Sequence, residues 1–140
     1  MNIKLLYSEL QSLVKSKTGR DIALSAIDER TVRVEAKVKV KVPLLGEIEK
    51  HIGVNVSVEQ IEGNDIRLNY SGGLGTDMII GGLLTYVTST PGVNMVEKTS
   101  GNGVVVHLAE IDEARKVLDM AELTDIVFHD DGVFIVARFR

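Results

Sequence analysis

The sequence contains no cysteine and no tryptophan, and it has only three phenylalanines, three tyrosines and two prolines among 140 residues. Without cysteine the chain cannot form disulfides, thiolate zinc sites, iron–sulfur clusters or a catalytic thiol. The few aromatic side chains leave few platforms for stacking bases, which readers of single-stranded nucleic acids need. The formal net charge of −4 also argues against binding dominated by phosphate contacts. We therefore expect no nucleic-acid partner.

Long hydrophobic runs are absent as well. The longest apolar stretch, 78–87, is interrupted by two glycines and a threonine, and it is far shorter than the roughly 20 residues that a membrane-spanning helix needs. Near the N-terminus, Glu9 and Gln11 interrupt any apolar core of a signal peptide. We expect no transmembrane segment and a cytoplasmic protein.

The sequence is rich in aliphatic residues, which make up most of its 44% hydrophobic content. A chain of this length fits a single domain, residues 1–140, that buries roughly 70% of its unfolded surface. Valine and isoleucine favour the pleated, half-buried surface of a sheet. The composition therefore favours a domain that contains much β-sheet.

The strongest pattern is a strict alternation over residues 32–42, with valine or alanine at even positions and charged residues at odd positions. This period of two predicts a strand with one buried and one solvated face. At about 3.4 Å per residue the strand would approach 40 Å, so it must twist or bend. Shorter alternations over 54–59 and 66–71 predict two further strands, and residues 31–71 together predict an antiparallel meander.

The rest of the chain predicts helices and shorter strands. Helical spacing of apolar residues predicts an amphipathic helix over 2–17, a nearly all-apolar helix over 77–88 and a second amphipathic helix over 110–121. Strands are expected at 21–28, 93–97, 103–108, 124–129 and 133–139. The expected fold class is α+β, with a long curved antiparallel sheet, a meander of long strands, packed with an N-terminal helix and two further short helices.

Motifs for catalysis are missing. The glycines of 72–75 precede a predicted helix, but no lysine follows them as in a phosphate-binding loop. The three histidines lack the spacing of a metal site, and the acid pairs 28–29 and 130–131 lie in predicted turns. We expect no enzyme, no catalytic residue, no metal and no cofactor.

A row of cations, Arg33, Lys37, Lys39 and Lys41, lies on the polar face of the predicted strand 32–42. Such a row can contact the phosphates of anionic lipid or nucleic acid. It can also be a solvated face that protects a sheet from aggregation, which is the interpretation we favour.

The long sheet and the apolar helix can enclose either a dry core or a groove. An aliphatic groove would suit acyl chains and few polar ligands. The residues expected to line it are Val34, Val38, Val40, Val54, Val56, Val58, Ile79, Ile80, Leu83 and Leu84. Leu44 and Leu45, in an apolar turn, would form its rim or contact a partner.

The C-terminal region, from 111–118 through 130–135, has the pattern of a helix, a strand, an Asp-Gly turn and a final strand. With the order of the preceding elements, this pattern resembles the end of tubular lipid-binding (TULIP-like) domains. The resemblance implies a long curved sheet wrapped around a helix, with lipid held in the groove. Two functions remain open: a non-enzymatic module that holds a lipid or another apolar ligand, and a structural or protein-interaction domain, possibly a homo-oligomer, without a small-molecule ligand.

Overall fold

The computed structural model describes residues 2–72, 96–110 and 112–140. In chain order the elements are β1 (Asn2–Leu6), α1 (Tyr7–Thr18), β2 (Ile22–Asp28), β3 (Thr31–Val42), β4 (Gly46–Glu62), β5 (Asp65–Gly72), β6 (Val96–Lys98), β7 (Gly103–His107), a 3-10 turn (Leu108–Glu110), α3 (Asp112–Leu118), β8 (Ala121–Phe128) and β9 (Gly132–Phe139). The described residues are mostly antiparallel strand with few helices, which confirms an α+β fold.

The strands form two sheets in the part of the chain that the structure describes. The larger sheet has the order β2-β3-β4-β5-β7-β6, and the smaller has the order β1-β9-β8. Because β3, β4 and β5 pair with one another in chain order, the predicted meander is confirmed. The final hairpin β8–β9 belongs to the smaller sheet, in which β9 also pairs with β1.

The predicted helix over 2–17 is wrong for its first five residues. Residues Asn2–Leu6 form β1, whose Ile3 and Leu5 pair with Ile135 and Val133 of β9. The spacing of these two side chains fits the period of a strand as well as that of a helix. The local sequence does not reveal that β9 supplies backbone hydrogen-bond partners for this segment. Helix α1 therefore begins only at Tyr7.

The ends of α1 follow local rules. The Glu9 carboxylate accepts a hydrogen bond from the backbone N–H of Leu6 at 3.0 Å, which satisfies a donor at the start of the helix. Gly19, with φ of +73°, ends the helix and donates its N–H to the carbonyl of Lys15 at 2.8 Å. A left-handed residue at this position is a common helix terminator.

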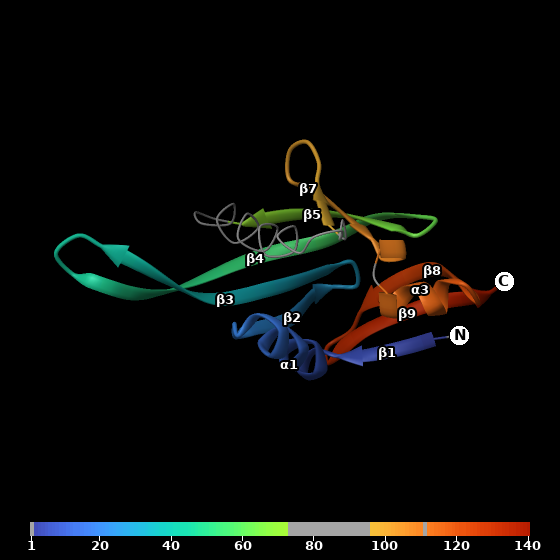
Figure 1. Ribbon diagram of the computed structural model, residues 1–140, viewed down its shortest axis with the longest axis horizontal. Coiled ribbons are helices and arrows are strands. Elements are labelled where there is room, and N and C mark those ends of the chain that lie inside the picture. The colour runs from blue at the N-terminus through green and yellow to red at the C-terminus, as the bar shows by residue number, and fades with distance from the viewer. Residues whose placement is uncertain (1, 73–95, 111) are drawn as a thin grey trace.

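An apolar core joins the two sheets. Ile66 of β5 packs in one cluster with Leu123 and Ile126 of β8 and Val133 of β9, and Leu10 of α1 packs against it. Figure 1 shows β8 and β9 below β4 and β5, at the right of the molecule. This cluster therefore explains why the smaller sheet packs on one end of the larger one.

A second cluster lies within the larger sheet. It contains Val54 of β4, Tyr70 of β5 and Val104 of β7, all at most 9% exposed. Val34 of β3 and Val56 of β4 pack against it while staying partly exposed. The buried face of the larger sheet thus continues along β4 beyond the part that faces the smaller sheet.

The turn between β2 and β3 connects both sheets through its backbone. The carbonyl of Arg30 accepts a hydrogen bond from the N–H of Val58 in β4, and the carbonyl of Glu29 accepts one from the N–H of Phe128 in β8, both at 2.9 Å. One turn therefore fixes a strand of each sheet.

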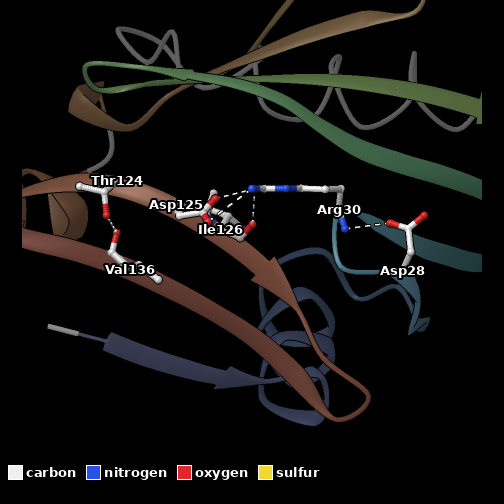
Figure 2. A network of polar contacts seen from close by, with 6 residues as sticks. All are labelled: Asp28, Arg30, Thr124, Asp125, Ile126 and Val136. Carbon is white, nitrogen blue, oxygen red and sulfur yellow. Dashed lines mark hydrogen bonds and ion pairs between the residues drawn. The ribbon is translucent and has the colours of Figure 1, made fainter.

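The Arg30 side chain adds a polar contact between the sheets, shown in Figure 2. Its guanidinium forms an ion pair with Asp125 of β8 and donates to the carbonyl of Ile126 at 3.0 Å. Its backbone N–H donates to the carboxylate of Asp28 at 2.8 Å. The hydrogen bond from Arg30 lowers the pKa of Asp125 and raises that of the guanidinium, because each charge stabilises the other.

The remaining predicted elements differ mainly in their bounds. The helix predicted over 110–121 is the shorter α3, and β8 begins at Ala121 rather than at 124. The helix predicted over 77–88 lies outside the described residues. Among the helices of the described residues, none is long and apolar enough to cross a membrane. The single-domain organisation over 1–140 stays a prediction.

Candidate functional site

The β3–β4 hairpin extends beyond its neighbours as a two-stranded ribbon, which we call the arm (residues 37–51). Pairing between β2 and β3 stops at Ala36, and pairing between β5 and β4 stops at Val54. From the pair Lys37–His51 to the turn, β3 and β4 pair with each other alone within the described residues. At about 3.4 Å per residue the arm reaches roughly 20 Å, and it projects to the left in Figure 1.

The tip of the arm is apolar and exposed. Leu44 is 105% exposed and Leu45 is 74% exposed. Leu44 also has φ of +72°, a left-handed conformation that costs a non-glycine residue about 1–2 kcal/mol. Burial cannot explain two leucines here, and turn geometry favours glycine or asparagine over Leu44. The tip is therefore a candidate interaction surface.

The two faces of the arm differ in polarity. On β4, Ile48 and Lys50 share a face with Ile52, which is 7% exposed, and with the buried Val54, because alternate residues of a strand point the same way. Val42 of β3 pairs with Gly46 on this face. We call it the apolar face, and it continues from the tip into the core of the body.

The opposite face carries most charges of the ribbon. Its cross-strand pairs are Lys37 with His51, Lys39 with Glu49, and Lys41 with Glu47. Opposite charges facing each other across an antiparallel ladder stabilise the pairing modestly. This polar face holds three of the four cations in the row identified from the sequence, and all of its side chains are exposed.

Charge is distributed unevenly between the arm and the rest of the chain. The arm contains four lysines and two glutamates, a net +2, whereas the remaining residues include twelve basic and eighteen acidic ones, a net −6. Lys50 is the arm lysine that lies at a register position of the apolar face, opposite Val38. The apolar face thus carries one lysine, between the exposed Ile48 and the buried Ile52.

The residues predicted to line the groove lie in different parts of the structure. The structure brings Val34, Val54 and Val56 together around Tyr70, and it places Val58 in the cluster between the sheets. Val38 and Val40 occupy register positions of the arm opposite Lys50 and Ile48. Ile79, Ile80, Leu83 and Leu84 lie outside the described residues. An acyl-chain groove along these residues stays a prediction.

The hollow at the base of the arm is lined mainly by charged residues. It measures about 480 Å³ and is lined by Gly19, Arg20, Asp21, Lys37, Lys39 and Glu49. Asp21 forms an ion pair with Lys15, at 3.2 Å between the carboxylate and Nζ. Mixed charges on its walls suit water or small ions better than an acyl chain.

A titratable cluster lies at the other end of the larger sheet. His107 of β7 contacts the carboxylate of Asp65 in β5 through Nδ1 at 2.9 Å and that of Glu97 in β6 through Nε2 at 3.2 Å. The hydrogen bonds to Asp65 and Glu97 raise the pKa of His107. Residues 2–72, 96–110 and 112–140 contain no group of three acidic or histidine side chains suited to a metal ion.

Sequence reasoning found the tip but missed the arm that carries it. Leu44 and Leu45 were singled out, whereas Ile48 and Lys50 were not. A usable signal was strand length, since the alternation over 32–42 is longer than the predicted neighbours at 21–28 and 66–71. A long hairpin between two shorter strands must overhang them on at least one side.

Comparison of the chain with protein-family models, with curated proteins and with solved structures finds no match. The resemblance to tubular lipid-binding domains therefore stays a prediction. The proposed function below rests on the arm and the exposed leucines at its tip.

Proposed function

We propose that the protein is a non-enzymatic module that binds a lipid or another apolar partner through the end of the β3–β4 arm. The observation that carries this proposal is the exposure of Leu44 and Leu45 on a ribbon that extends from the body. Two adjacent exposed leucines cost solubility without adding to the core, and exposed apolar patches commonly mark interaction sites.

The arm also suits this role mechanically. Its strands continue into β3 and β4 of the body, whose Val54 is 1% exposed, so the tip is held by a packed core. A loop supported by a rigid scaffold is where binding residues are commonly found. The predicted groove would offer the same partner a second apolar surface, and the cytoplasmic location also stays a prediction.

The test compares the wild-type chain with a Leu44→Ser/Leu45→Ser variant. We would measure co-purified lipid by native mass spectrometry, flotation with phosphatidylcholine vesicles and self-association by sedimentation. We expect association in at least one measurement and at least a tenfold loss in the variant, because each buried leucine contributes about 1.5–3 kcal/mol.

The control is Leu13→Ser, which alters a 50% exposed leucine of α1, away from the arm. This variant should keep the association of the wild type. Absence of association in all three measurements, or association that the tip variant retains in full, would refute the proposal.

A further inference from the structure

We propose that the partner of the arm is the surface of an anionic lipid bilayer, with the apolar face turned toward it and Lys50 at the headgroups. This inference rests on the proposed function and specifies its partner. It follows from how apolar and charged residues are placed on the two faces of the arm.

The exposed apolar part of the arm has the length expected of a segment that inserts shallowly into a bilayer. Leu44 and Leu45 are exposed at the tip, and Ile48 is 38% exposed two residues beyond Gly46. At about 3.4 Å per residue, these side chains cover roughly 10 Å of the arm. Peripheral apolar surfaces enter a bilayer to a depth of about 5–10 Å, at the boundary of headgroups and acyl chains.

The charge at the edge of this patch has the sign that such a surface attracts. Lys50 shares the face of Ile48 and is exposed. A lysine beside apolar residues can lay its methylene chain along them and extend its ammonium group to the phosphate level. Glu47 and Glu49 lie on the opposite face together with the other three lysines of the arm, and that face points away from a bilayer that the apolar face contacts.

The overall charge distribution favours an approach in which the arm, rather than the body, meets the anionic surface. The arm is net +2 and the remainder of the chain net −6, so an anionic surface attracts the arm and repels the body. Such a distribution steers the encounter before any contact forms.

A second copy of the chain fits this surface less well. Two copies could pair their β3 edges antiparallel, with both apolar faces on the same side of the joined ribbon. This pairing would place Lys37, Lys39 and Lys41 of one copy opposite lysines of the other. Like charges directly opposite destabilise a ladder, and lysines on an edge are a known protection against such pairing. Self-association through the arm is thus an outcome for the test rather than our proposal.

The experiment measures flotation of the full chain with two kinds of vesicle, phosphatidylcholine alone and equal parts phosphatidylcholine and phosphatidylglycerol. We expect stronger binding to the anionic vesicles, and weaker binding at high salt because salt screens exposed charges. Lys50→Gln should weaken binding to the anionic vesicles roughly fivefold, which corresponds to one lysine near an anionic surface.

The matched control is Lys39→Gln, which removes the same charge from the polar face of the same ribbon. It should weaken binding less than twofold. Leu44→Ser/Leu45→Ser should remove most binding to both kinds of vesicle.

Each alternative outcome overturns a distinct statement. Equal effects of the two lysine variants would overturn the assignment of Lys50 and the orientation of the arm. Equal binding to both kinds of vesicle would overturn the anionic partner. Absence of vesicle binding together with tip-dependent self-association would overturn the bilayer proposal and leave the proposed function intact, whereas absence of any tip-dependent association would end both.

Discussion

The two ends of the β3–β4 hairpin use the same alternating pattern under opposite conditions. In the body, Val54 and Ile52 are 1% and 7% exposed. There, the β3–β4 hairpin lies between β2 and β5 in the larger sheet. In the arm, Ile48 on the same face is 38% exposed and the tip leucines are fully exposed or nearly so. Burial explains the apolar residues of the body, but it does not explain those of the arm.

The difference teaches that one periodic pattern can encode two roles. A two-stranded ribbon is at best marginally stable alone, so the arm depends on the body for its conformation. In return, the arm extends its apolar tip beyond the other described strands, as Figure 1 shows. The comparison predicts that substitutions in the body change stability, and that substitutions in the arm change binding.

The largest expected effect comes from truncating an isoleucine in the body, compared with the same truncation in the arm. Ile66→Ala, in the cluster between the sheets, should lower the free energy of unfolding by about 3 kcal/mol, the typical cost of truncating a buried isoleucine. Ile48→Ala, on the arm, should lower it by less than about 0.5 kcal/mol. Urea unfolding measures both, and similar costs would show that the arm is packed as tightly as the body.

A gain in stability is expected at the tip. Leu44→Gly should stabilise the folded arm by about 1 kcal/mol, because glycine adopts a φ of +72° without strain. The same variant should bind partners more weakly, since the leucine side chain is lost. Hydrogen exchange of the amides of the arm gives the stability effect, and faster exchange in the variant would contradict the strain assigned to Leu44.

A smaller effect is expected where Arg30 joins the sheets. Because the folded pKa of Asp125 is lowered, this contact contributes stability above the unfolded value of about 3.9, and the contribution is lost as the pH falls through the lower folded value. Arg30→Gln should thus lower the urea midpoint near neutral pH and match the wild type in strong acid. A constant difference at all pH values would mean that Arg30 acts through packing rather than charge.

The smallest effect is expected at His107, with the opposite dependence on pH. Its raised pKa means that its contribution is full below the unfolded value of about 6.5 and is lost as the pH rises through the folded value. His107→Gln should differ most from the wild type in mild acid and converge with it in alkali. An NMR titration gives the pKa directly, and a value at or below that of a free histidine would refute the hydrogen bonds to Asp65 and Glu97.

The sequence predicted the meander well because alternation specifies both the strand and its faces. The valines at even positions of 32–42 and 54–58 determine which side of β3 and β4 meets the core, and the structure buries Val32 and Val54 there. The tip was predicted for the same reason, since Leu44 and Leu45 interrupt the alternation in a turn where polar residues are expected.

Pairing partners were beyond the reach of the sequence. Ile3 and Leu5 fit a helix as well as a strand, and β9, to which they pair, is more than 120 residues away. The arm was missed because its length depends on where β2 and β5 stop pairing, and bulges at Ala26/Asp28 and Val58/Gln60 shift those registers. Such irregularities arise from tertiary packing and leave no period in the sequence.

Because the ladder of the arm is uninterrupted, insertions can change the length of the arm without disturbing its pairing. Its six consecutive pairs, from Lys37–His51 to Val42–Gly46, contain no register shift. Inserting two residues into each strand would move the tip outward by about 7 Å and keep every existing side chain on its face, whereas one residue per strand would invert the distal faces. Variants of this chain can therefore differ in arm length by even steps and still present the same apolar face at a new distance.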